Sequence, residues 1–232
     1  MRKLQVYALG SYFKLGSPNA GLNANPMRGL MYLVTNQRKE PIPSSVQHPL
    51  HPSKHMERLE TPAAAYEYVA EIIAVNGRDI RASLNITKPN IALVPIPSSN
   101  IVRTNRTTDR WPSRDLAMGL ERLGFGKVRQ CVVYKDAMRP RFSYEEDPAH
   151  ELAQNIVILG RPMPNEAVLY IDDLVLTGDR TVAVDHALGQ PPGASLLTAV
   201  IGEEKQRLDA YKTRSIPMEY DPGSTPWKIN LG

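Results

Sequence analysis

Cysteine is almost absent from this chain, since its 232 residues include only Cys131. A single cysteine excludes an intrachain disulfide and a zinc site rich in thiolates. Long apolar runs are also missing: none reaches the roughly 18 residues of a membrane-spanning helix. The apolar N-terminus is short and interrupted by Gln5, Gly10 and Lys14. These absences predict a protein of the reducing cytoplasm, with no membrane span and no signal peptide.

The chain has only a small excess of positive charge, because 28 basic and 24 acidic residues leave a net charge of +4. This charge is compatible with an anionic partner, either a phosphorylated metabolite or a nucleic acid. A nucleic acid is not favoured, because Glu145, Glu146 and Asp147 follow the basic stretch. The spacing of His48, His51 and His55 is an alternative metal cluster, but a solvated loop explains these histidines better, since no other ligand type accompanies them.

Apolar periodicity predicts the fold class. Residues 4–13 and 29–35 are strand-like and suggest a hairpin, and Thr61 and Pro62 open a helix that ends at Asn76. From Ile91 onward, strands alternate with helices, which predicts an α/β protein with a doubly wound, mostly parallel sheet. We expect an N-terminal accessory lobe over residues 1–60, an α/β core over 61–212 and an irregular tail over 213–232. The expected strands are 91–94, 128–134, 156–159, 167–171 and 195–201, and the expected helices include one capped by Ser113 and one over 179–188.

The segment VLYIDDLVLTGDRT, residues 168–181, gathers groups that bind phosphate and ribose. Asp172 and Asp173 end an apolar strand, where open α/β sheets bind ligands, and strand alternation predicts that they face opposite sides. The turn at Gly178 leads into a helix, whose first N–H groups and positive dipole end suit a phosphate. The hydroxyls of Thr177 and Thr181 and the guanidinium of Arg180 are further donors.

This segment resembles the ribose-phosphate motif of type I phosphoribosyltransferases. The resemblance implies that Asp172 and Asp173 hold ribose hydroxyls, directly or through magnesium. It also implies that the residues after them cradle the 5-phosphate of phosphoribosyl pyrophosphate. The chain departs from the family pattern at Arg180, where the family has Thr or Ser, and at Leu176, where purine-salvage members carry an aspartate. The implied phosphate-binding residues are Thr177, Gly178, Asp179, Arg180 and Thr181.

A second segment, LVPIPSS at residues 93–99, is similar to the pyrophosphate loop of the same family, especially of its ComF-like members. The resemblance covers roughly residues 90–202, and the N-terminal zinc ribbon usual in ComF-like members has no cysteines here. It implies that Ser98, Ser99 and Asn100 bind pyrophosphate. An Arg-rich stretch follows, with Arg103, Arg106, Arg110 and Arg114. Lys135, Arg139 and Arg141 match the mobile catalytic loop and would neutralise the departing pyrophosphate.

The resemblance implies a hooded type I phosphoribosyltransferase fold and a magnesium-dependent glycosyltransferase (pentosyltransferase) of nucleotide metabolism. It would move phosphoribose to or from a nitrogenous base, and we expect a homodimer. One alternative is a regulator that binds phosphoribosyl pyrophosphate or a nucleotide without turnover. Another is a reverse-transcriptase-like nucleotidyl transferase, in which Asp172 and Asp173 would hold two metal ions in a hairpin. The third alternative is purely structural: Asp172 and Asp173 would only cap the turn that follows their strand.

Overall fold

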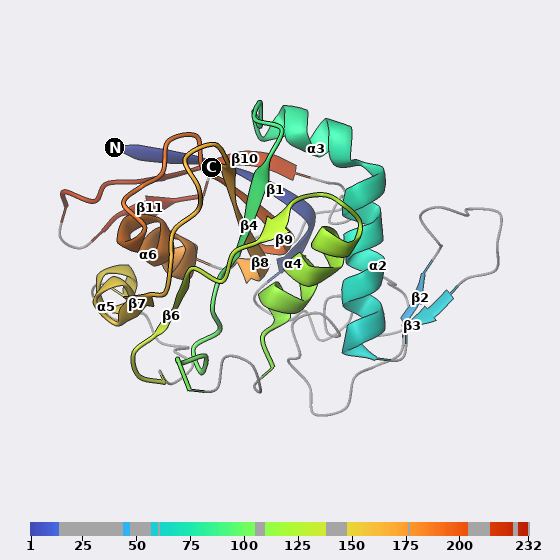
Figure 1. Cartoon of the computed structure of the whole chain (residues 1–232), viewed down its shortest axis with the longest axis horizontal. Helices are drawn as coiled ribbons and strands as arrows, with labels where there is room; N and C mark the ends of the chain where they lie inside the picture. Colours follow the sequence, from blue (N-terminus) through green and yellow to red (C-terminus); the bar gives the residue numbers. More distant parts are fainter. Residues whose placement is uncertain are drawn as a thin grey trace.

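A mostly parallel sheet of seven strands forms the centre of the molecule (Figure 1). A computed structural model describes residues 1–13, 44–46, 57–59, 61–104, 110–137, 148–175, 177–203, 214–224 and 227–231. The strand order is β11-β10-β1-β9-β8-β4-β5; β1, β9, β8, β4 and β5 are parallel, and β10 is antiparallel to both its neighbours. The strands are β1 (Arg2–Phe13), β4 (Ile91–Pro95), β5 (Lys127–Val128), β8 (Ala167–Val175), β9 (Ser195–Glu203), β10 (Arg214–Tyr220) and β11 (Ile229–Asn230). The predicted α/β class with a mostly parallel sheet is confirmed.

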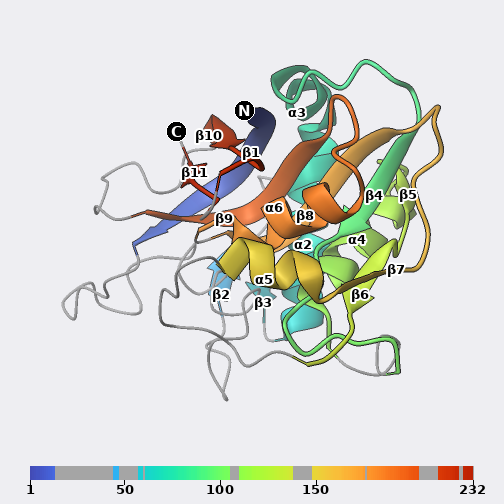
Figure 2. The same ribbon diagram turned by 90° about the vertical axis from the view of Figure 1, so that its left-hand side faces the viewer.

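Helices cover both faces of this sheet, as Figure 2 shows, with α5 and α6 in front and α2 and α4 behind. One apolar cluster joins the sheet to the second pair through residues such as Ile73, Leu93 and Leu120. The other joins it to α6 through Val94, Tyr170 and Val182. The helices are α2 (Pro62–Val75), α3 (Gly77–Ser83), α4 (Pro112–Arg122), α5 (Pro148–Gln154) and α6 (Asp179–Ala187). Two small antiparallel sheets pair β2 (Ser44–Val46) with β3 (Glu57–Leu59) and β6 (Val132–Tyr134) with β7 (Ile156–Ile158). None of the helices in the described ranges has the length and apolarity that crossing a membrane needs.

The helix predicted after Thr61 is confirmed as α2. The Thr61 hydroxyl accepts the backbone N–H of Ala64 at 3.2 Å, and Pro62 occupies the first turn, where its missing N–H costs nothing. On the neighbouring helix α4, a Cβ added to Gly119 would lie 2.9 Å from the Cβ of Ala70. Glycine at this position therefore lets the two helices pack closely.

Two parts of the predicted domain division are wrong. Residues of β1, assigned to an accessory lobe, form an inner strand of the main sheet, parallel to β9 and antiparallel to β10. The tail is not irregular, since β10 and β11 extend the same sheet. Both errors arise because strand pairing between distant segments leaves no local trace in the sequence. The predicted hairpin partner 29–35 and His48, His51 and His55 lie outside the described residues.

The strand predicted over 128–134 is two strands in different sheets. β5 ends at Val128, although the N–H of Arg129 still donates to the carbonyl of Leu93 at 2.8 Å and its side chain donates to Glu166 at 2.7 Å. β6 then pairs with β7 in a separate sheet. Helices α3 and α5 were not predicted. The strand that carries the acidic pair is longer than predicted and reaches Val175, so Asp172 and Asp173 lie within it.

A buried carboxylate ties four elements together. Asp185 of α6 is 0% exposed and accepts Nε of Arg2 at 3.0 Å, the hydroxyl of Tyr170 at 2.8 Å and that of Tyr220 at 2.6 Å. These donors come from β1, β8 and β10. The side chain of Arg2 also donates to the carbonyl of Pro191 at 2.6 Å. The orientation of α6 on the sheet is therefore fixed by charge-assisted hydrogen bonds as well as by apolar packing.

Replacing this carboxylate tests its role. We expect Asp185→Ala to lower the free energy of unfolding by about 3–5 kcal/mol, because it leaves a partly buried guanidinium and two buried hydroxyls without their acceptor. Glu219→Ala is the matched control, because it removes the exposed ion pair of Lys3 and Glu219 (3.1 Å) from the same pair of strands. It should cost no more than about 1 kcal/mol. Urea unfolding measures both values, and equal losses would contradict the assigned role of Asp185.

Candidate functional site

The two loops singled out in the sequence leave the sheet at the same carboxyl edge, although β8 runs four residues beyond Ile171, to Val175. Strands β4 and β8 are parallel neighbours, and Pro95 lies opposite Ile171. Directly after β4, the backbone N–H of Ile96 donates to the carbonyl of Ile171 at 2.9 Å. The loop that follows β4 and the loop that follows β8 therefore start at the same carboxyl edge, which is where α/β sheets bind ligands.

The loop after β4 is fixed by two buried side chains. The carbonyl of Ile96 accepts the indole N–H of Trp111 at 2.8 Å and the hydroxyl of Ser113, and both side chains are 0% exposed. The sequence had suggested that Ser113 caps helix α4, but this prediction is wrong, because Trp111 occupies the cap position. Beyond this anchor the carbonyl of Ser98 accepts the N–H of Ile101 at 2.9 Å. The predicted pyrophosphate residues Ser98 and Ser99 are half-buried and Asn100 is exposed.

The loop after β8 has the backbone of a tight strand–helix connection. Gly178 adopts φ +86°, and its carbonyl accepts the N–H of Val182 as α6 begins. The hydroxyl of Thr177 donates to Asp179 at 2.5 Å. A Cβ on Gly178 would lie 2.7 Å from the sulfur of Met218, so β10 lies directly against this turn. The first N–H groups of a helix have no acceptor within it, so the start of α6 can supply donors to an anion.

Arg180 turns back from this loop onto the acidic pair. Its Nη2 lies 3.2 Å and 3.4 Å from the two carboxylate oxygens of Asp172 and donates to the carbonyl of Leu174 at 3.0 Å. The Oδ1 of Asp172 also accepts the N–H of Asp173 at 2.9 Å. The Asp172 side chain is only 2% exposed, whereas that of Arg180 is 30% exposed. The structure therefore joins the acidic pair and the start of α6 through one ion pair.

Burial and charge together set the protonation of this cluster. Burial raises the pKa of Asp172 well above its usual range; Arg180 opposes this rise, and the adjacent Asp173 carboxylate adds to it. Burial also disfavours the charge of Arg180, but Asp172 and Asp173 outweigh it and raise the pKa of the guanidinium. Both carboxylates thus act on the same cation. Asp172 contacts Arg180 of α6, whereas the charge of Asp173 also raises the pKa of Tyr66 on α2, which covers the other face of the sheet.

Tyr134, at the end of β6, is a site residue that the sequence did not reveal. Its backbone N–H donates to the carbonyl of Ile101 at 2.9 Å, which links β6 to the loop after β4. Its side chain is 0% exposed, and burial raises its pKa to about 12, while Arg180 lowers that pKa and Asp172 raises it. Within the described part of the chain, its hydroxyl and that of buried Thr181 have no hydrogen-bond partner. A tyrosine at the end of the apolar run CVVY has the sequence pattern of a core residue and gave no functional signal.

The predicted catalytic residues are only partly described. Lys135 follows Tyr134 directly, its side chain is exposed, and its N–H donates to the carbonyl of Asn155 at 2.7 Å. It thus lies one residue from the link to the loop after β4. Arg139 and Arg141 lie outside the described residues, as does Arg106.

The donor set does not fit a magnesium ion bound directly by Asp172. Magnesium requires oxygen ligands in near-octahedral order. Oδ1 of Asp172 accepts a backbone N–H and the guanidinium of Arg180, and Oδ2 faces the same guanidinium. A direct ligand role for Asp172 would therefore require Arg180 to leave it.

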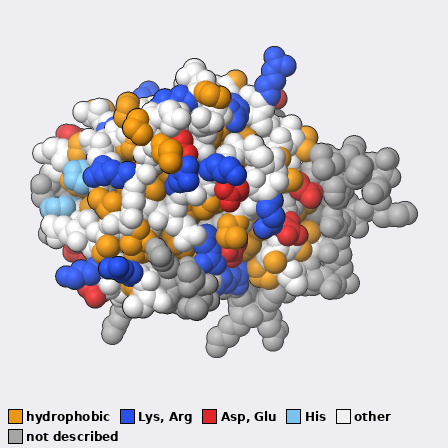
Figure 3. Space-filling view, viewed as in Figure 1, with side chains coloured by type: hydrophobic (Ala, Val, Ile, Leu, Met, Phe, Trp, Pro, Cys, Tyr) orange, Lys and Arg blue, Asp and Glu red, His pale blue; other side chains and the backbone are white. Residues whose placement is uncertain are grey.

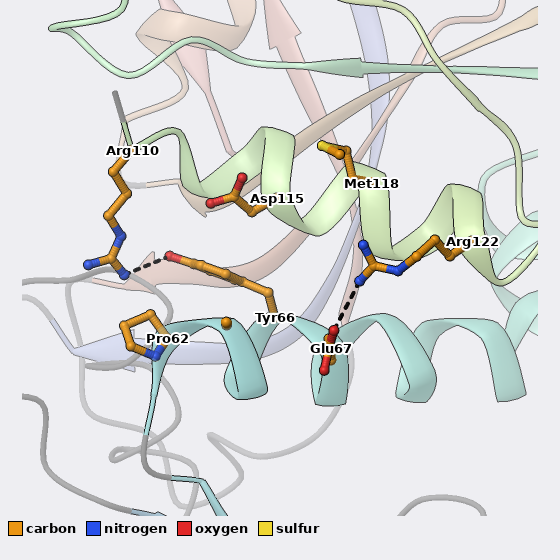
Figure 4. Close-up of a pocket in the computed structure, with 8 residues that line it drawn as sticks. Pro62, Tyr66, Glu67, Arg110, Asp115, Met118 and Arg122 are labelled. Atoms are coloured by element: carbon orange, nitrogen blue, oxygen red, sulfur yellow. Dashed lines mark hydrogen bonds and ion pairs between the residues drawn. The ribbon is translucent and has the colours of Figure 1, made fainter. Parts of the chain in front are cut away.

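A groove of about 470 Å³ lies between α2 and α4 (Figure 4). Burial of Tyr66 and then the charge of Asp173 raise the pKa of its phenol, whose hydroxyl accepts Nη2 of Arg110 at 3.2 Å. Arg122 pairs with Glu67 across the groove at 3.2 Å. The charged groups shown in Figure 4 are thus engaged with protein partners, and the groove is less suited to a phosphate than the two loops are.

Surface charge does not favour a nucleic-acid partner on the face that Figure 3 shows, because basic and acidic side chains are interspersed there. No protein-family model matches the chain, and no curated protein matches it significantly. The geometry of the carboxyl edge is therefore the basis for a functional assignment.

Two glycine substitutions test how closely the loop after β8 is packed. We expect Gly178→Ala to destabilise the protein more than Gly193→Ala, by a further ~1–2 kcal/mol. Both residues have positive φ, which costs alanine roughly 1–2 kcal/mol, but a Cβ on Gly193 meets nothing within 4 Å. Urea unfolding of the two variants measures the difference, and equal stabilities would show that β10 does not restrain this loop.

Proposed function

We propose that this chain is a phosphoribosyltransferase-like protein that binds phosphoribosyl pyrophosphate at the carboxyl edge of its parallel strands. The observation that carries the proposal is the pairing of β4 with β8, which brings the loops resembling the pyrophosphate and ribose-phosphate motifs to the same carboxyl edge of the sheet. The proposal includes the fold: the parallel strands and the helices on both faces are compatible with a type I phosphoribosyltransferase core.

The proposed reaction moves phosphoribose to or from a nitrogenous base. The bond between the anomeric carbon and the pyrophosphate oxygen breaks, a bond from that carbon to a base nitrogen forms, and the nitrogen loses its proton to solvent. Negative charge accumulates on the departing pyrophosphate, so the protein contributes mainly donors and positions. Backbone N–H groups of the loop at Ser98–Asn100 and the exposed ammonium of Lys135 would serve the pyrophosphate, and the start of α6 the 5-phosphate. We assign no step to magnesium on Asp172.

A second candidate is a regulator that binds the same ligand without turnover. The ion pair of Arg180 with Asp172 favours it, because this carboxylate is turned inward and 2% exposed. The nucleotidyl-transferase alternative has less support. The strand that carries the acidic pair lies between two parallel neighbours, β4 and β9, and leads into α6, whereas a polymerase pair needs an antiparallel hairpin.

Titration calorimetry with phosphoribosyl pyrophosphate in the presence of magnesium tests the proposal. We expect saturable binding that Asp173→Asn weakens by about tenfold or more, since lost hydrogen bonds to a charged group typically cost 1.5–3 kcal/mol. Asp136→Asn, at an exposed position after Lys135, is the control and should bind like the wild type. Absence of binding in the wild type would eliminate the proposal. Pyrophosphate release upon addition of bases then separates the transferase from the regulator.

A further inference from the structure

We infer that the guanidinium of Arg180 is the built-in cation of the acidic pair, so that the chain binds a phosphorylated ribose without a magnesium ion at Asp172. This inference rests on the proposed function, because it concerns how the same ligand is held. It departs from what the family resemblance implies, since the resemblance implies magnesium at this pair.

The contacts of Asp172 carry the first step. Arg180 faces both of its carboxylate oxygens, and the N–H of Asp173 takes a further acceptor position on Oδ1. With 2% of the side chain exposed, little of this carboxylate remains accessible to a hydrated ion. Magnesium gives up its water ligands reluctantly and would have to displace a positively charged group that is already in place.

The remaining donors of Arg180 carry the second step. All of its contacts to Asp172 and Leu174 use Nη2. Among the described residues, Nη1 and Nε have no hydrogen-bond acceptor, and the side chain is 30% exposed. One guanidinium can therefore hold the carboxylate on one side and a ligand oxygen on the other, which is the bridging role that a divalent ion would otherwise have.

Ribose 5-phosphate is the sharpest probe, because it lacks the pyrophosphate that itself binds magnesium. We expect the wild type to bind it with dissociation constants that differ by less than about threefold between excess EDTA and excess magnesium, a difference well below 1 kcal/mol. The same titrations with phosphoribosyl pyrophosphate show whether magnesium acts only through the ligand. Binding that needs magnesium for both probes would overturn the inference and leave the proposed function intact. Failure of both probes under both conditions would remove both.

Substitutions of Arg180 test whether its guanidinium is responsible for binding in the absence of magnesium. We expect Arg180→Gln to weaken binding in EDTA by about 10-fold to 100-fold, the range for a lost charge-assisted hydrogen bond, and magnesium to restore part of the loss. Arg180→Lys keeps the positive charge but loses the planar set of guanidinium donors. Its dissociation constant in EDTA should therefore lie between those of the wild type and of Arg180→Gln. Arg129→Gln is the control, because it breaks an ion pair with buried Glu166 that the site does not use. Wild-type binding by folded Arg180→Gln in EDTA would refute the inference, and the wild-type titrations decide it even if that variant does not fold.

Discussion

The carboxylate of Asp185 has no exposure to solvent, and its oxygens are surrounded by one guanidinium and two phenols. Such a group is stable inside a protein only if all of its donors are present, so their elements must assemble together. The donors come from the N-terminal strand β1, from β8, which carries the acidic pair, and from β10. The carboxylate itself belongs to α6, six residues beyond the first residue of that helix, Asp179. Any tilt of α6 would break these hydrogen bonds, so the loop at its start is held in place from inside the core.

The other loop of the site is held in the same manner. Trp111 and Ser113 bring the start of α4 onto the carbonyl of Ile96, and Tyr134 attaches β6 to Ile101 through its backbone. Both loops are thus fixed near the sheet by buried hydrogen bonds, while their outer residues, such as Asn100 and Lys135, remain exposed. The ligand binding that we propose would need this combination, because donors must be aligned before the ligand arrives.

Local pattern predicted those parts of the fold whose causes are local. The cap at Thr61, the buried strand before Asp172 and the glycine turn at Gly178 are each encoded by a few neighbouring residues, and the structure contains all three. The place of β1 in the main sheet could not be read in this way, because its partners lie about 190 and 210 residues away along the chain. The same limit hid Tyr134, whose place near the loop after β4 depends on its backbone hydrogen bond to Ile101. It also misled us over Ser113, which bonds across the fold instead of capping its helix.

Arg180 shows why the motif alone was insufficient for the chemistry. At the sequence level it was an added donor in a phosphate loop, since nothing in the segment states which way a long side chain turns. In the fold it lies against the carboxylate of Asp172, whose negative charge is costly at this buried site, and the charge of Asp173 also acts on it. A chain with Thr or Ser at this position would need another cation to neutralise the pair. With arginine there, neutralisation is part of the polypeptide, and the acidic pair can be buried to the degree observed. The departure from the family pattern and the burial of Asp172 therefore have the same physical explanation.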